Sequence, residues 1–281
     1  MGKLNRFFVG IGFFLLGLVA CDRIPEGKYV IDYQVPGTEG EHRVLLEEYT
    51  GMRCVNCPAA ARQVGLLAET FGSRLVTVAF HAGGFAVPTG IFQPDLRTEA
   101  GNGYFSHFGF DGTPVGMVNR TGALNADQWG AAVAKELEQN PVVVLKTMVA
   151  YDTTDRSYTA HLEMTTMSEN RDYSLLLWLV EDSLVTPQVT PAGTERSYVQ
   201  RHVFRHALNG MWGESLSSSF VGDSVFIKSN PFILPEEYDA KHCSVVFAVA
   251  ETGNRRVVEV AQTELITEKA YNRKQPLKSE Q

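Results

Sequence analysis

The sequence has no cluster of basic residues. Its 281 residues include 25 Lys and Arg against 32 Asp and Glu, which gives a formal net charge of -7. Phosphate backbones are bound by several lysines and arginines gathered on one surface, so we predict no nucleic-acid partner. The chain is 44% hydrophobic, which is enough to bury a substantial core, and its length suggests two domains.

Cysteine is also scarce, with four residues in all. Cys54 and Cys57 form one C-x-x-C motif, whereas a structural zinc site needs four ligands, usually from a second such motif or a suitably spaced histidine pair. None follows, so we expect no metal and no cofactor. His202 and His206 could chelate a metal if they were helical, but no third ligand is evident and a surface pair is expected. Cys243 lies in an apolar run and is expected to be a buried free thiol.

The apolar run at the N-terminus, Phe7 to Leu16, is too short for a comfortable membrane span. Because positively charged residues precede it, we expect residues 1–20 to be an export signal. Leu18-Val19-Ala20-Cys21 resembles the bacterial lipobox, which implies that Cys21 is lipidated and holds the protein to a membrane through acyl chains. The alternative is an ordinary signal peptide with a coincidental cysteine. Residues 21–43 are expected to be a tether with one edge strand.

The stretch from Val44 to Arg62 carries the chemistry. A short apolar run that ends at Tyr49 predicts a buried strand, and Thr50-Gly51 predicts a turn after it. The C-x-x-C motif then begins an alanine-rich pattern that predicts a helix. A helix N-terminus stabilises a thiolate through unpaired N–H groups and the helix dipole. We therefore expect Cys54 there as the nucleophile, with its pKa lowered further by Arg53, and Cys57 one turn into the helix as the resolving thiol. The alternative is a structural disulfide, which would also persist in an exported protein.

Two further features resemble the thioredoxins. Glu48 lies six residues before Cys54, where thioredoxins carry a buried carboxylate that exchanges protons with the resolving thiol. Burial would raise its pKa toward neutrality, and a solvent-facing glutamate is the alternative. Gly112-Thr113-Pro114 resembles the thioredoxin G-T-P stretch, in which the proline is cis. The resemblance implies that Thr113 and Pro114 face Cys54 and present backbone to the substrate, and a trans turn is the alternative.

The pattern changes after residue 141. β-rich runs separated by polar turns cover residues 142–151, 158–166, 173–180, 223–232, 243–250 and 256–265. The one stretch among them that could be helical is 199–207. The predicted fold is therefore an α/β thioredoxin-like domain over residues 44–140, followed by an all-β antiparallel (Ig-like) sandwich over residues 141–268 and a polar tail over residues 269–281.

Together, four features resemble the outer-membrane-protein-twenty-eight-related lipoproteins of Bacteroidota. They are the lipobox, the motif Y-T-G-x-x-C-x-N-C-P, the G-T-P stretch that ends in Val118-Asn119-Arg120, and the β-rich half with Gln200 to Arg205. The resemblance implies an outer-membrane lipoprotein that faces the periplasm or the cell surface. It implies an architecture and a location, and it names no reaction.

Two functions are consistent with these features. In the first, the protein is a thiol-disulfide oxidoreductase: Cys54 attacks a disulfide of an exported protein or peptide, and Cys57 displaces the product. In the second, it is a binding lipoprotein whose C-x-x-C pair is a structural disulfide. Arg53 replaces the Trp that usually precedes the first cysteine of thioredoxins, which speaks against the enzyme. An insertion, Phe85 to Pro94, is expected to form a loop over or beside the site.

Overall fold

The structure, a computed structural model, describes residues 29–34, 41–167, 172–216 and 224–265. Its helices are α1 (Cys57–Phe71), α2 (Glu99–His107) and α3 (Trp129–Leu137), with single turns η1 (Gly72–Arg74), η2 (Gly84–Ala86) and η3 (Ala126–Gln128). The strands are β1 (Tyr29–Gln34), β2 (Val44–Thr50), β3 (Leu75–His81), β4 (Val115–Val118), β5 (Val143–Asp152), β6 (Ser157–Thr166), β7 (Tyr173–Glu181), β8 (Leu184–Thr190), β9 (Gly193–Gln200), β10 (Val203–Ala207), β11 (Glu214–Leu216), β12 (Ser224–Lys228), β13 (Phe232–Ile233), β14 (Cys243–Glu251) and β15 (Val257–Glu264). The predicted export signal, Cys21 and the predicted polar tail lie outside the described residues.

One eight-stranded sheet runs through both halves of the chain. Its order is β15-β14-β7-β10-β3-β2-β4, with β11 paired to β7. The two halves meet where β10 pairs in parallel with β3 at Val203 and Ala79, and the Ala79 N–H donates to the His202 carbonyl at 2.7 Å. The shared sheet differs from the predicted architecture, in which residues 44–140 and 141–268 form two separate domains.

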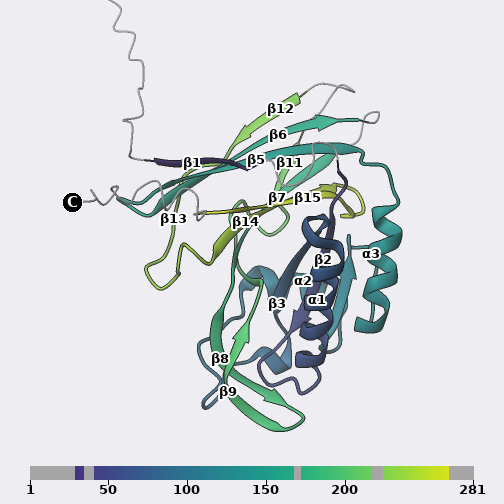
Figure 1. The fold of residues 1–281 in the computed structure, drawn as a ribbon, viewed down its shortest axis with the longest axis vertical. Coiled ribbons are helices and arrows are strands. Elements are labelled where there is room, and N and C mark those ends of the chain that lie inside the picture. Colours follow the sequence, from purple (N-terminus) through teal and green to yellow (C-terminus); the bar gives the residue numbers. More distant parts are fainter. Residues whose placement is uncertain (1–28, 35–40, 168–171, 217–223, 266–281) are drawn as a thin grey trace, which may run out of the picture.

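A second sheet covers one face of β7 and β14. It contains β1, β5, β6 and β12 in that order, with β13 paired to β6, and Figure 1 shows it stacked over the larger sheet. Buried side chains such as Leu145, Leu177 and Phe247 form one core between the two layers. The expected sandwich of antiparallel strands is therefore present, but one of its sheets continues into the α/β half. The edge strand β1 pairs with β5 of this second sheet, and not with the strands that directly follow it.

The buried strand β2 separates two cores by simple alternation. Val44 and Leu46 pack with residues of α1 and α3 on one face, whereas Leu45 and Tyr49 join an aromatic core with Tyr104 of α2 on the other. Successive side chains of a strand point to opposite faces. Glu48 therefore lies on the α1 side of the sheet, and Glu47 lies on the aromatic side.

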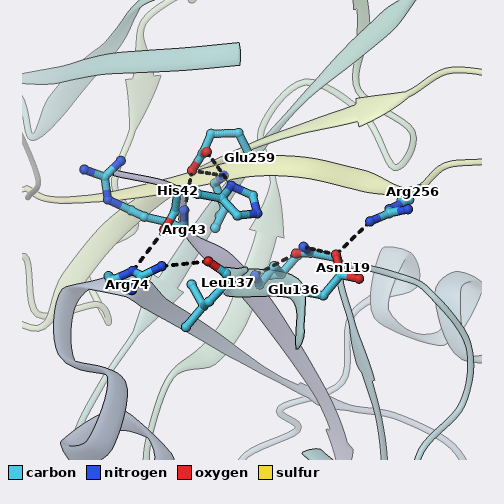
Figure 2. A network of polar contacts seen from close by, with 10 residues as sticks. His42, Arg43, Arg74, Asn119, Glu136, Leu137, Arg256 and Glu259 are labelled. Carbon is cyan, nitrogen blue, oxygen red and sulfur yellow. Dashed lines mark hydrogen bonds and ion pairs between the residues drawn. The ribbon is translucent and has the colours of Figure 1, made fainter. Parts of the chain in front are cut away.

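Buried polar contacts also tie the two halves together (Figure 2). His42 Nδ1 lies 2.8 Å from a carboxylate oxygen of Glu259 on β15, and the Arg43 N–H donates to the other oxygen at 2.9 Å. Glu136 of α3 accepts from Asn119 Nδ2 at 3.0 Å and from Arg256 at 2.8 Å. These contacts link residues near β2, β4 and α3 to β15, so the α/β half is fixed to the sandwich by more than the shared sheet.

A hairpin of β8 and β9 forms a separate two-stranded sheet. Figure 1 shows it extending away from the sandwich along the α/β half. The stretch 199–207, for which a helix was an open alternative, is not helical: it contains the end of β9, a two-residue link and β10. Within the part of the chain that the structure describes, none of the helices has the length and hydrophobicity needed to cross a bilayer.

Candidate functional site

The C-x-x-C motif lies where β2 passes into α1. The chain leaves β2 at Thr50 and turns, with the Cys54 N–H donating to the Gly51 carbonyl at 3.0 Å, and Cys54 and Cys57 are joined by a disulfide bond. The helix begins at Cys57, with Asn56 as its N-cap residue. Cys54 therefore lies in the turn before the helix, and Cys57 is the first helical residue rather than one turn in.

The helix N-terminus nevertheless reaches the first sulfur. The backbone N–H of Cys57, one of the donors that a helix leaves unpaired at its start, donates to Cys54 Sγ at 3.1 Å. Such a donor stabilises negative charge on the sulfur once the disulfide is reduced. Both cysteines are buried, with 2% of each residue exposed.

The Thr113-Pro114 loop lies against the same sulfur. The peptide bond between these two residues is cis, and the Thr113 carbonyl oxygen lies 3.4 Å from Cys54 Sγ. Directly after this loop, β4 pairs antiparallel with β2, which places the loop beside the end of β2. The structure thus brings together Cys54, Cys57, Thr113 and Pro114, as the sequence pattern indicated.

Glu48 lies beneath the motif, on the α1 side of the sheet. It lines a cavity of about 390 Å³ together with Cys57, Arg62 of α1 and Tyr198 of β9, whereas Cys54 is not part of this lining. Burial raises the pKa of the Glu48 carboxyl to about 8, so it is mostly protonated at neutral pH. Among the described residues, its Oε1 atom has no hydrogen-bond partner. Glu48 is therefore a buried carboxyl group that holds a proton at neutral pH and lines the same cavity as Cys57.

Arg53 binds the neighbouring loop. Its guanidinium donates to the Gly84 carbonyl at 2.5 Å, and its backbone N–H donates to the Phe85 carbonyl at 3.1 Å. The guanidinium keeps its charge at this neutral carbonyl, and an effect of Arg53 on the pKa of Cys54 stays a prediction. These contacts fix the predicted insertion beside the C-x-x-C turn.

Exposed apolar side chains lie on the turn and on the insertion beside it. Val55, between the two cysteines, is 43% exposed, and Phe85 is 51% exposed. Val87 and Ile91 of the insertion are exposed as well. We refer to Val55, Phe85, Val87 and Ile91 as the apolar rim. Of the two phenylalanines of the insertion, Phe85 faces solvent, whereas Phe92 is partly buried and packs against the cluster of Met52, Leu96 and Val203.

Sequence reasoning missed the hairpin of β8 and β9, which contacts the C-x-x-C turn. Gln188 Nε2 donates to the Cys54 carbonyl at 3.0 Å and to the Gly51 carbonyl at 3.3 Å. The Val189 N–H donates to the Met52 carbonyl at 2.8 Å. The only available signal was the Pro191-Ala192-Gly193 turn between two polar, β-branched stretches.

The weaker candidates lie elsewhere. His202, in the link between β9 and β10, has its Nδ1 atom 3.3 Å from an Asp182 carboxylate oxygen, and His206 lies on β10, so the two histidines do not share a helix. Cys243 is buried at the start of β14 and is the free cysteine of the described residues. Burial raises the pKa of its thiol, which disfavours the reactive thiolate.

A solved structure shares this architecture. HBP35 of Porphyromonas gingivalis superposes with a TM-score of 0.65 at 17% identity, over 86% of this chain and 79% of that chain; at this identity the likeness shows the fold alone. A domain of the outer membrane lipoprotein Omp28 from Porphyromonas gingivalis superposes with a TM-score of only 0.30 at 15% identity, over 44% of this chain and 88% of that chain.

A search of curated proteins finds no match. The family model described as outer membrane protein Omp28 matches residues 101–269, which is more than half of the chain. The matched segment includes Thr113 and Pro114, and it runs through the sandwich to the end of β15. The chain therefore belongs to the Omp28 family of outer membrane proteins.

Proposed function

We propose that this protein is a lipid-anchored thiol-disulfide oxidoreductase of the cell envelope, with a thioredoxin-like N-terminal half. The observation that carries the proposal is the position of Cys54 Sγ, which accepts from the Cys57 N–H at 3.1 Å and lies 3.4 Å from the Thr113 carbonyl. A helix-terminal donor stabilises the thiolate, and a facing carbonyl can accept a backbone N–H of an extended substrate. The anchor would be acyl chains on Cys21, which hold the protein at the outer membrane.

The reaction is a pair of thiol-disulfide exchanges. With the pair reduced, the Cys54 thiolate attacks one sulfur of a substrate disulfide, so that a Cys54–substrate S–S bond forms and the substrate bond breaks. The departing substrate thiolate takes up a proton from solvent. Cys57 then gives its proton to the fraction of Glu48 that is ionised and attacks Cys54, which restores the Cys54–Cys57 disulfide. The second substrate sulfur leaves as a thiolate and takes up a proton from Glu48 or from solvent. The substrate is reduced by two electrons, and the reverse sequence would oxidise a dithiol.

Exported polypeptides are the substrate class that fits this site. The apolar rim offers exposed side chains on the C-x-x-C turn and on the insertion that is bonded to it, which suits an extended apolar peptide. A small polar thiol would gain little binding free energy from contact with the apolar side chains of Phe85 and Ile91. The acyl anchor would keep the site in a compartment in which disulfides persist.

Turnover and reduction potential together test the proposal. Wild-type protein should catalyse reduction of insulin by dithiothreitol, Cys54→Ser should not, and Cys243→Ser should match the wild type. The reduction potential should lie above about -300 mV, since structural disulfides of secreted proteins lie below that value. Absence of turnover by the wild type, together with a lower potential, would contradict the enzyme.

A binding lipoprotein is the second candidate, and one observation favours it: both cysteines are only 2% exposed. A disulfide kept for stability would be protected in this way. In that case the apolar rim would bind its partner without exchange of sulfur bonds. Substitution of both cysteines by serine would then lower stability and leave partner binding intact, whereas the oxidoreductase loses all exchange activity.

A further inference from the structure

The hairpin of β8 and β9 satisfies three carbonyl groups of the turn that carries Cys54. Gln188 Nε2 donates to the carbonyls of Gly51 and Cys54, and the Val189 N–H donates to that of Met52. Gln188 lies 134 residues beyond Cys54 in the chain. A segment from the C-terminal half is therefore built onto the redox turn of the N-terminal half.

The Gln188 amide is itself held in place. The residue is 2% exposed, and its Oε1 atom accepts from Gln200 Nε2 at 3.1 Å. Gln200 Nε2 also donates to Thr186 Oγ1 at 3.1 Å. Because the acceptor end of Gln188 is fixed by Gln200, its donor end points toward the turn.

The Cys54 carbonyl oxygen that accepts from Gln188 is also a second acceptor for the N–H of Cys57. That N–H lies 3.1 Å from Cys54 Sγ and 3.4 Å from the Cys54 carbonyl oxygen, so the two acceptors compete for one proton. Gln188 Nε2 supplies the carbonyl with a closer donor, at 3.0 Å. A carbonyl oxygen that already accepts a close bond is a weaker acceptor for a second donor, so the Cys57 N–H, which contacts both atoms, is drawn toward the sulfur.

We propose that Gln188 is a positioning residue for the redox pair. By occupying the Cys54 carbonyl, it keeps the Cys57 N–H on Cys54 Sγ and so stabilises the thiolate of the reduced protein. Without the amide, the N–H turns to the carbonyl, the pKa of the Cys54 thiol rises, and reduction of the disulfide becomes less favourable. An effect of Gln188 on turnover rests on the proposed function. Its effect on the equilibrium between disulfide and dithiol can be measured whether or not the protein is an enzyme.

Gln188→Met removes the donor and keeps the length of the side chain. The equilibrium constant for reduction by dithiothreitol should fall about tenfold, which corresponds to a potential about 30 mV more negative. In a Cys57→Ala background, the pKa of Cys54, read from the ultraviolet absorbance of the thiolate, should rise. Gln262→Met is the matched control, because Gln262 Nε2 donates only to Ser244 Oγ among the described contacts, at 2.7 Å, in the strand pair β14–β15.

A change of less than about twofold in a folded Gln188→Met protein would overturn the proposal. If that variant does not fold, Gln200→Met takes its place: loss of the bond that orients Gln188 should shift the constant in the same direction, and an unchanged constant would overturn the proposal. A general loss of stability would not raise the pKa of Cys54. A wild-type protein without insulin turnover would contradict the proposed function, yet it would leave both equilibrium measurements valid.

Discussion

The carbonyl oxygen of Thr113 lies 3.4 Å from Cys54 Sγ, although 59 residues separate them in the chain. The contact joins the loop before β4 to the turn after β2, and the antiparallel pairing of those two strands maintains it. A substrate disulfide that reaches Cys54 must therefore approach beside the backbone of Thr113.

Glu48 should make stability depend on pH. Its pKa is raised from 4.5 to about 8 by burial, so between these values the folded protein binds a proton that the unfolded chain has released. Below about pH 4.5, the protonated Glu48 carboxyl makes its full contribution to the free energy of unfolding. This contribution falls by at most about 5 kcal/mol as the pH rises to about 8. Glu48→Gln cannot titrate, and its advantage over the wild type in urea denaturation should grow across this window. A constant difference from pH 4.5 to 8 would show that Glu48 is not the titrating group.

Gly51 should be needed for contact between the C-x-x-C turn and the insertion. A Cβ atom at this position would lie 2.6 Å from the backbone carbonyl carbon of Phe85, so one of the two segments must move. We expect Gly51→Ala to destabilise the protein by about 1–3 kcal/mol and to slow insulin turnover. Gly65→Ala is the control, because a Cβ at this exposed position of α1 meets nothing and should stabilise by about 0.5–1 kcal/mol. Equal stability of the two variants would refute the predicted clash.

The buried ion pair of Arg120 and Glu47 should be sensitive to loss of one partner. Arg120 binds the carboxylate through two nitrogens at 2.9 and 3.0 Å, and both side chains are almost fully buried. Arg120→Met leaves the Glu47 charge unpaired and should cost about 3–5 kcal/mol in denaturant unfolding. Arg97→Met, which removes the partly exposed pair with Asp95, should cost less than about 1 kcal/mol. Similar losses for both variants would contradict the account.

Phe85 should contribute to binding of polypeptide substrates. Phe85→Ser removes an exposed ring from the apolar rim, so KM for insulin should rise about three- to tenfold while the reduction potential stays the same. Phe226→Ser is the control: this residue is 75% exposed, and its strand β12 lies on the far side of the molecule from the β8–β9 hairpin (Figure 1). If Phe226→Ser raised KM as much as Phe85→Ser, the rim would not be a specific surface.

Local patterns predicted five of the longer strands of the C-terminal half. The apolar and alternating runs at residues 142–151, 158–166, 173–180, 243–250 and 256–265 correspond to β5, β6, β7, β14 and β15. Each run combines alternating or dense apolar residues with polar turns on both sides, and this is information that a short window contains. The same is true of β2 and of the helix that follows the C-x-x-C motif.

The hairpin and the shared sheet depend on distant contacts and escaped prediction. β8 contains Pro187, and a second proline, Pro191, follows it directly; prolines argue against a strand. Its position depends on Gln188 and Gln200, which bond across the hairpin and to the C-x-x-C turn. The junction of β10 with β3 is a single residue pair. Neither kind of contact leaves a periodic trace in the sequence.

Trapping of the mixed disulfide tests the central claim most directly. In Cys57→Ala protein, Cys54 can attack a substrate disulfide but nothing displaces the product, so a covalent Cys54–substrate complex should accumulate with an oxidised exported polypeptide and disappear on addition of dithiothreitol. Mass spectrometry should locate the bond at Cys54. If no complex forms in Cys57→Ala protein that is folded and reduced, or if the bond forms at Cys243, the account of Cys54 as the attacking nucleophile is contradicted.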